Sequence, residues 1–570
     1  MLKTQHKKII AFIAVIFILF LWFGGINKSD LYSDNALNSF RAYGWFDRLL
    51  GGQQAPIDWL GHIPSWALLS FHDAPPVAFM LQNISFTFFG GSPFGARAPF
   101  VFAGLISVLA LCIAVKRIVG TEKAIWAACL LAINSYAVWA GLAGYLEGIE
   151  QLFIITSLFA LYFLTTNEDA KPHWLYIGAA SSALACMTKY TAIFIFLPAL
   201  FALIRYRKNV LGSFRTKEWS IALSIFIVII LPVVIYNIAM YQERGHFDAA
   251  LSSIVGMHPA DFSAISSRGI DFNPLKNISS TFSSFAENNS FGFSLLSALS
   301  VLWIIYKCIR RTSDRFEEHT LSFFLSFLLM SAFFSGGTRF DSVLTPIIAI
   351  LTALAVCDWK NRTRESKRYI LVGTIVLICV FEAFYAINTN ILVKPIGVHG
   401  VFYSKSKLSD YGFNELDSYL RKNVITRLPL KKSIRSPKDL NFTNKDVAGR
   451  SVVIYDDRIN WFAQNWYFLR YINYHAVPIL SDVYFDPTQG GVNLIDLVAI
   501  SRKDLYVISP ISKEVLDTKR IIPAGQIDLV DKFVEALEEE KIQGDIIKNL
   551  AGKEMFKVYR VPSERLLKVQ

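Results

Sequence analysis

The chain has 570 residues, of which 53% are hydrophobic and 18% charged, and its formal net charge is +12. A soluble globular protein is usually about 45–50% apolar and about 25% charged, so this composition excludes a wholly soluble chain. The Lys and Arg residues cluster between apolar runs, which favours membrane topology over nucleic-acid binding as the reason for the positive charge.

Apolar segments recur from the N-terminus to about residue 390. A helix needs roughly 20 apolar residues to cross a bilayer, and most of these segments are close to that length. The basic stretch before the first segment is not followed by an Ala-x-Ala type cleavage site, so we expect an uncleaved first span. We predict about eleven transmembrane helices, at 9–25, 97–115, 124–142, 150–165, 173–187, 190–204, 219–240, 291–306, 319–335, 342–357 and 369–388.

Orientation follows from the connecting segments, because cytoplasmic loops carry an excess of Lys and Arg. With the N-terminus placed in the cytoplasm, the inner segments hold clearly more Lys and Arg than the outer loops. An odd number of spans then places the C-terminal region outside. The expected location is the cell (plasma or inner) membrane, multi-pass, with an extracytoplasmic C-terminal domain.

Two regions are predicted. Residues 1–390 form the transmembrane domain, with an outer loop at 26–96 that carries amphipathic, interfacial helices and a Ser- and Asn-rich outer loop at 241–290 that is typical of a mobile loop or lid. Residues 391–570 form a soluble α/β domain with a mixed or parallel sheet, in which SVVIYDD, VPILSD, DLYVISP and EMFKVYRV are strands.

Ionisable residues gather at the predicted outer face, where they are costly and usually face a cavity or a partner. Each has an ordinary alternative: Asp34 as a loop acid, Glu147 or Glu150 as a helix cap, Lys189 as a snorkelling side chain, and Arg339 as the partner of Asp341. All of these residues are predicted to lie on one side of the membrane, and this shared location favours a common site. Cations for a phosphate and carboxylates for an acceptor would together suit a phosphate-bearing lipid substrate.

Several segments resemble the membrane glycosyltransferases of the GT-C fold, and in particular the dolichyl-phosphate-mannose–protein mannosyltransferases and the lipid A aminoarabinose transferases. The resemblance is good over residues 1–210, loose to about 390 and absent in the tail. The segments that carry it are LYSDNALNSFRAYG, FHDAPPVAFMLQNISFTFFGGSPFGARAPF, GYLEGIEQLF and ACMTKYTAIF.

The resemblance implies roles for individual residues. Asp34 matches the family's acceptor-activating acid in the first outer loop, and either Glu150 or Glu147 matches its second acid. Lys189, Arg339 and Arg97 match cations that contact the donor phosphate. His72 and Tyr145 belong to the matched segments and are expected to shape the site.

The family often has Asp-Glu where this chain has Asp34-Asn35, which weakens any role that needs two adjacent carboxylates, such as a tight metal site. The sequence has no CxxC metal pattern and indicates no definite cofactor, and a divalent metal stays an open alternative.

The implied activity is transfer of a sugar, a hexose or a pentose, from a polyprenyl-phosphate donor to an acceptor hydroxyl on the outer face. The reaction would invert the sugar carbon, with Asp34 as general base. The acceptor would be a glycan, a lipid or a protein of the cell envelope. The alternative is a transporter or flippase of lipid-linked substrates, although the halves show no repeat and the acids lie at one face of the membrane, not at its midplane.

Overall fold

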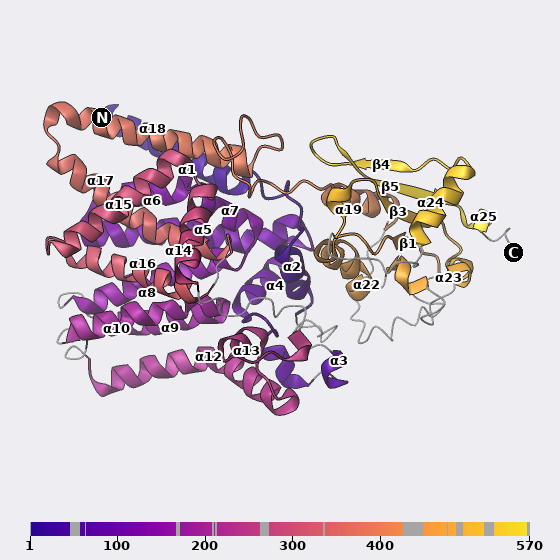
Figure 1. Ribbon diagram of the computed structural model, residues 1–570, viewed down its shortest axis with the longest axis horizontal. Helices are drawn as coiled ribbons and strands as arrows, with labels where there is room; N and C mark the ends of the chain where they lie inside the picture. The colour runs from indigo at the N-terminus through magenta and orange to yellow at the C-terminus, as the bar shows by residue number, and fades with distance from the viewer. Residues whose placement is uncertain are drawn as a thin grey trace. The chain divides into compact units, whose positions relative to one another are not determined.

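The computed structural model describes residues 2–45, 57–62, 64–166, 171–207, 210, 214–262, 273–334, 337–425, 448–475, 477–485, 494–517 and 529–566. Parts of the predicted outer loops 26–96 and 241–290 lie outside these residues. The chain divides into two compact units, which Figure 1 shows as a bundle of helices and a sheet flanked by helices. Unit 1 comprises Met1–Ile26 and Trp59–Lys407, and unit 2 comprises Asn27–Asp58 and Leu408–Gln570.

Unit 1 is helical. Its elements are α1 (Leu2–Phe23), η3 (Ser65–Leu69), α4 (Val77–Phe89), α5 (Pro93–Val119), α6 (Thr121–Ile133), α7 (Ser135–Ala143), α8 (Glu147–Thr165), α9 (Pro172–Thr188), η4 (Tyr190–Ile195), α10 (Phe196–Arg205), α12 (Thr216–Arg244), α13 (Ala249–Ile254), η5 (Ala260–Phe262), α14 (Pro274–Asn288), α15 (Phe291–Ile309), α16 (Arg315–Phe333), η6 (Phe340–Leu344), α17 (Thr345–Arg362) and α18 (Glu365–Asn390). The short α3 (Ile57–Leu60) precedes η3.

Every predicted span contains helix. Within the part of the chain that is described, six helices are long and apolar enough to cross a membrane, and the bent pair α6–α7 would be a seventh. Three shorter apolar helices, at Lys8–Phe23, Val77–Phe89 and Tyr190–Arg205, accompany them. The chain is therefore a membrane protein, and the number eleven stays a prediction.

The predicted single span 124–142 is instead two helices that meet at a 53° bend. The bend lies at Asn134, whose side chain accepts a hydrogen bond from the Ala137 N–H at 2.8 Å and so caps α7. Glu382 of α18 accepts hydrogen bonds from the backbone N–H groups of Ser135 at 2.9 Å and of Ser290 at 2.8 Å. Because free N–H groups at a helix start need acceptors, this one carboxylate fixes the starts of α7 and α15.

The core of unit 1 surrounds α17. The window of this helix that qualifies as a span is 94% buried, against 22% for α12, whose apolar side chains face outward as lipid contact requires. Trp22 packs between α5 and α7 so closely that a Cβ at Gly104 would lie 2.0 Å from its ring. Small residues of this kind let neighbouring helices approach, which is how membrane helices pack without a hydrophobic driving force.

Unit 2 contains a five-stranded sheet of order β2-β1-β3-β5-β4. Strands β2, β1 and β3 are parallel, while β5 pairs antiparallel with both β3 and β4, so the tail contains a mixed sheet, the first of the two alternatives predicted for it. The elements are α2 (Asp34–Tyr43), α19 (Phe413–Asn423), β1 (Val452–Tyr455), α21 (Trp461–Gln464), the π-helix η8 (Asn465–Leu469), α22 (Arg470–His475), β2 (Ile479–Ser481), η9 (Asp482–Phe485), α23 (Leu494–Ser501), β3 (Leu505–Pro510), η11 (Lys513–Val515), α24 (Leu529–Glu539), β4 (Asp545–Lys548), β5 (Glu554–Val561) and α25 (Ser563–Leu566).

Unit 2 is not one continuous stretch of chain after residue 390. The segment that follows the first apolar helix, residues 27–58, belongs to the same unit as the C-terminal sheet. The described part of this segment includes α2, which carries Asp34 at its first residue. The C-terminal region therefore folds together with a peptide from the start of the chain.

Candidate active site

The two acids of the GYLEGIE segment begin α8. Gly144 ends α7 in the left-handed conformation, at φ 74°, and the chain then turns into α8 at Glu147. Residues three apart lie on the same side of a helix, so Glu147 and Glu150 project together. Both are buried, at 1% and 0% exposure, and buried carboxylates require partners.

Lys189 supplies one of those partners. It lies where α9 ends and η4 begins, and its ammonium group forms an ion pair with Glu147 Oε1. The same ammonium lies 3.4 Å from the centroid of the Phe340 ring, a cation–π contact. Two residues on, Thr191 donates a hydrogen bond to Glu150 Oε1 at 2.8 Å. The α9–η4 connection thus contacts both acids, and Lys189 is not simply extended toward an interface.

Arg339 approaches from the connection between α16 and α17. Its Nε lies 4.0 Å from Glu147 Oε1, and its guanidinium stands over the rings of Tyr145, at 5.8 Å, and Phe340, at 5.0 Å. Lys189 and Arg339 keep 13% and 22% of their side-chain surface exposed, against 2% for Glu147. Two partly accessible cations therefore lie against one buried carboxylate, and their exposed surface is the part that an incoming anion would contact.

The connection that carries Arg339 is held by neighbouring helices. The Tyr136 hydroxyl of α7 donates to the Thr338 carbonyl, and Gln151 of α8 donates to the Ser342 carbonyl at 3.0 Å. Asp341 accepts a hydrogen bond from Thr281 of α14 at 3.0 Å. These contacts fix the backbone on both sides of Arg339.

We call Tyr145, Glu147, Glu150, Lys189 and Arg339 the cation cluster. The structure brings these five predicted residues together from three connections of unit 1. Tyr136, Gln151, Thr191 and Phe340 also belong to its surroundings and were not predicted. Thr191 and Gln151 had a sequence signal, since each is a polar residue close to Lys189 or Glu150 in an apolar run.

Arg97 and His72 come from other elements of unit 1, and Arg97 lies beside the α7–α8 connection, where a Cβ at Gly144 would be 3.4 Å from its side chain. Arg97 is fully buried in α5, where it donates a hydrogen bond to the Ile26 carbonyl at 2.9 Å. His72 packs against Trp59 and Phe262, with ring centroids 5.5 and 6.1 Å away, and its carbonyl accepts from the Ala249 N–H at 2.7 Å. These contacts join the two outer loops, while the predicted roles of Arg97 in phosphate binding and of His72 in shaping the site stay predictions.

Asp34 belongs to unit 2, where it is the half-buried first residue of α2. The neighbouring Asn35 folds back and accepts hydrogen bonds from the backbone N–H groups of Tyr32, at 3.2 Å, and Ser33, at 3.1 Å. This turn sets the direction in which α2 begins. Among the described residues, no group of three His, Cys, Asp or Glu side chains is arranged to hold a metal ion.

Comparison with known proteins places these features in context. A family model described as dolichyl-phosphate-mannose-protein mannosyltransferase matches residues 73–236, the region that contains Arg97, Glu147, Glu150 and Lys189. No sequence among curated proteins matches the chain.

Solved structures share the fold of nearly the whole chain. ArnT from Cupriavidus metallidurans bound to undecaprenyl phosphate is 12% identical with a TM-score of 0.51, over 97% of this chain and 98% of ArnT. In the apo state, ArnT is 11% identical with a TM-score of 0.50, over 98% of both chains. The archaeal oligosaccharyltransferase AglB from Archaeoglobus fulgidus, in complex with an inhibitory peptide and a dolichol-phosphate, is 12% identical with a TM-score of 0.50, over 97% of this chain and 74% of AglB. The predicted resemblance to the GT-C fold is confirmed.

Proposed function

We propose that the chain is an integral-membrane glycosyltransferase that moves a sugar from a polyprenyl-phosphate donor to an acceptor hydroxyl on the outer face of the membrane. The observation that carries the proposal is the pair of partly accessible cations, Lys189 and Arg339, on the buried carboxylate of Glu147. The matched family and the fold shared with ArnT and AglB, which were solved with undecaprenyl phosphate and dolichol-phosphate, support the same donor class.

The cation cluster would bind the donor phosphate. As the bond between C1 of the sugar and the phosphate oxygen breaks, negative charge grows on the phosphate. Fixed cations in a site that is poor in water stabilise such charge strongly. Glu147 would hold Lys189 and Arg339 in place before the phosphate arrives. Arg97, which belongs to α5, is proposed to add to the positive potential at the donor phosphate.

The acceptor would be activated by Asp34. In a single inverting displacement, the acceptor oxygen bonds to C1 as the phosphate leaves, and the acceptor proton passes to the Asp34 carboxylate. A positioned base typically contributes about 10²–10⁴-fold.

Glu150 is proposed as the second acid. Its Oε1 accepts from Thr191, while Oε2 is buried and accepts no hydrogen bond from any residue that the structure describes. A buried acceptor without a donor is costly, so a substrate hydroxyl would be a favourable partner. Glu150 would then orient the sugar or the acceptor, and the sugar would be a hexose or a pentose.

The Lys and Arg bias of the connecting segments supports a cytoplasmic N-terminus and outer loops that carry the site. In this orientation the acceptor is a glycan, lipid or protein of the cell envelope. The bilayer itself is the second partner, since the donor's polyprenyl chain would lie in it.

The test uses the full-length protein in lipid nanodiscs. A panel of undecaprenyl-phosphate-linked hexoses and pentoses is offered with glycan, lipid and protein fractions of the envelope, and release of undecaprenyl phosphate is measured together with sugar transfer. Asp34→Asn should lower the transfer rate by about 10²–10⁴-fold and leave binding of undecaprenyl phosphate unchanged. Asp504→Asn, which removes an acid from a surface ion pair of unit 2, is the matched control and should stay active.

Two results would contradict the proposal. If no donor of the panel is consumed, but proteoliposomes move the same lipids between leaflets, the chain is a transporter. If sugar is transferred and Asp34→Asn retains the wild-type rate, the assignment of the base is wrong.

A further inference from the structure

Asp34 lies in a peptide of unit 2, residues 30–44, whose first residues are attached to α19. Asp30, which is 1% exposed, accepts hydrogen bonds from the backbone N–H groups of Tyr411, at 2.6 Å, and Asn414, at 2.9 Å. Its own N–H donates to the Ser409 carbonyl at 2.7 Å. Four residues before the proposed base, the backbone is therefore tied to the first turn of a helix from the C-terminal region.

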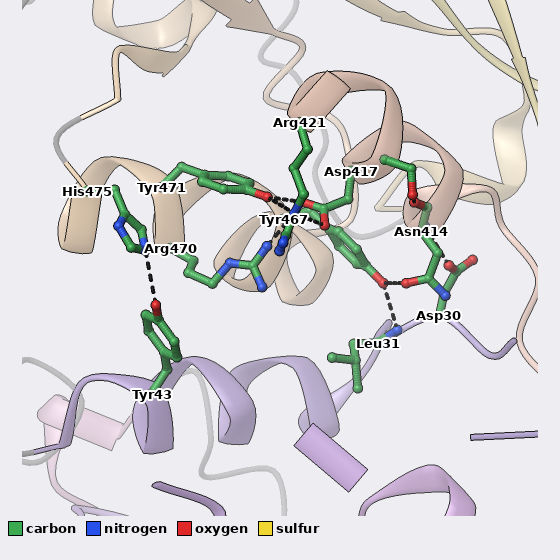
Figure 2. Close-up of polar contacts among 11 residues, drawn as sticks. Asp30, Leu31, Tyr43, Asn414, Asp417, Arg421, Tyr467, Arg470, Tyr471 and His475 are labelled. Carbon is green, nitrogen blue, oxygen red and sulfur yellow. Dashed lines mark hydrogen bonds and ion pairs between the residues drawn. The ribbon is translucent and has the colours of Figure 1, made fainter. Parts of the chain in front are cut away.

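A second attachment follows at the next residue. The hydroxyl of Tyr467 accepts a hydrogen bond from the Leu31 N–H at 3.0 Å and donates one to Asn414 Oδ1 at 2.8 Å. Figure 2 shows this hydroxyl between the two partners. Leu31 and Tyr467 are 0% and 1% exposed, so water is not available to replace the bond. The single hydroxyl links the peptide, η8 and α19.

The end of the peptide is held by α22. A hydrogen bond of 3.0 Å joins Tyr43 Oη and His475 Nε2, and the ring of Phe40 packs against Tyr474 with centroids 5.5 Å apart. At Gly44, a Cβ would lie 1.8 Å from the Tyr474 hydroxyl, so only glycine permits this approach. Asp34 thus lies between two anchored ends, ten or fewer residues from each.

The elements that receive the peptide are themselves braced. Asp417 of α19 accepts hydrogen bonds from Arg470, at 3.1 Å, from Arg421, at 2.9 Å, and from the Tyr471 hydroxyl (Figure 2). Arg470 is 1% exposed and its guanidinium stacks on Trp466 at 4.1 Å. A buried, hydrogen-bonded network of this kind holds side chains in one arrangement.

We propose that unit 2 positions the Asp34 carboxylate, with Tyr467 and His475 as positioning residues at the two ends of the peptide that carries it. This inference rests on the proposed function, in which Asp34 is the general base. A base must lie within hydrogen-bond reach of the proton it takes, and a displacement of about 1 Å can cost about 10²-fold in rate. The first residue of a short helix has little rigidity of its own, so the anchors supply it.

Tyr467→Phe tests the first anchor in the full-length protein. The ring and its stacking on Phe413, at 5.2 Å between centroids, are kept, and only the hydroxyl is removed. With the donor and acceptor pair identified by the panel, we expect kcat to fall about tenfold, with the donor KM and undecaprenyl phosphate binding unchanged. Amide hydrogen exchange in a peptide covering residues 31–45 should become faster, because its attachment is weakened.

Tyr43→Phe is the second variant, since it removes the hydroxyl at the other end and keeps the ring. Tyr419→Phe is the matched control: its hydroxyl donates to Asp545 at 2.6 Å within the same unit, on the same helix as Asn414. The control should change neither kcat nor exchange in residues 31–45. Equal thermal midpoints of Tyr467→Phe and Tyr419→Phe would then show that the loss of rate is not a general loss of stability.

The outcomes separate the two proposals. If Asp34→Asn is inactive while Tyr467→Phe and Tyr43→Phe keep the wild-type kcat, or if Tyr419→Phe lowers kcat equally, positioning by unit 2 is refuted and the proposed function stands. If Asp34→Asn is fully active, Asp34 is not the base and positioning by unit 2 is refuted with it, while the sugar transfer that the panel measures still supports a glycosyltransferase.

Discussion

The cation cluster of unit 1 and the anchored peptide of unit 2 are both polar and buried, yet they are built from different groups. In the cation cluster, ammonium, guanidinium and carboxylate groups meet from short connections, and the two cations remain partly exposed. Around the anchored peptide, a tyrosine hydroxyl accepts from the Leu31 N–H, a histidine contacts the Tyr43 hydroxyl, and the Phe40 ring packs against Tyr474. The cations of the cluster can exchange a carboxylate partner for a phosphate, whereas the contacts around the peptide can only hold its backbone in place.

The difference implies that substitutions in the two regions should be separable. Changes to the cation cluster should alter the affinity for lipid phosphate, and changes around the peptide should alter stability or rate at constant affinity. Three predictions, taken from the largest effect to the smallest, test this separation.

The largest effect is expected at Asp417. Asp417→Asn removes the negative charge that faces the buried Arg470, and an uncompensated buried charge costs about 3–5 kcal/mol. Thermal unfolding of the solubilised full-length protein, followed by tryptophan fluorescence, should show a transition shifted down by several degrees, with undecaprenyl phosphate binding unchanged below that transition. Asp545→Asn is the control on an exposed acid of the same unit and should cost less than about 1 kcal/mol. A loss of lipid binding in the folded Asp417→Asn variant would contradict the separation.

The second effect depends on pH. Burial, with a smaller contribution from the negative charge of Glu415, raises the pKa of Asp30 from 3.8 to about 7, although two backbone N–H groups oppose the shift. The folded unit then binds this proton more tightly than the unfolded chain. Its contribution to stability is complete below about pH 4 and is lost as the pH rises through about 7.

Wild-type protein should therefore lose about 2–3 kcal/mol of unfolding free energy between pH 5 and pH 7.5 from this group alone. Asp30→Asn cannot titrate, so its stability should vary less over the same range. Thermal midpoints measured at half-unit pH steps would show this as a flatter curve. Parallel curves for the two proteins would mean that Asp30 is ionised throughout the range.

The sequence predicted local features well, because local pattern determines them. The apolar runs became helices at every predicted span, and the predicted strands SVVIYDD and EMFKVYRV became β1 and β5. Strand β4 was missed, since Asp545–Lys548 is short and largely exposed and so lacks an apolar pattern. The break at Asn134 was also missed: a long apolar run conceals a bend that is stabilised by Glu382, a residue nearly 250 positions away.

Partners distant in sequence were beyond prediction for the same reason. The sequence could not decide between Glu147 and Glu150, and the structure gives them different partners, Lys189 and Thr191. Nor did any pattern in residues 27–58 indicate that α19 and α22 hold this peptide, since its anchors, Asp30 and Tyr43, are ordinary loop and helix residues by sequence. Tertiary packing determines these contacts, whereas the sequence alone shows only the type of each residue.

The smallest effect is the one that most directly tests the cation cluster. Lys189→Met keeps much of the side-chain volume and removes the ammonium, so one of the two phosphate contacts proposed for Lys189 and Arg339 would be lost. We expect the affinity for undecaprenyl phosphate, measured by native mass spectrometry in nanodiscs, to fall about 10–100-fold, or about 1.4–2.7 kcal/mol. Arg339, still close to Glu147, would account for the binding that remains.

Lys307→Met is the matched control. Lys307 is another lysine of unit 1 that pairs with carboxylates, Glu317 at 2.5 Å and Asp358 at 2.9 Å, and its loss, like that of Lys189, removes an ion-pair partner from a buried glutamate. Both variants should therefore lose stability, while only Lys189→Met should lose lipid affinity. Equal affinities for the two variants would mean that Lys189 merely neutralises Glu147, and the charge left over for a phosphate would then have to come from Arg339 alone.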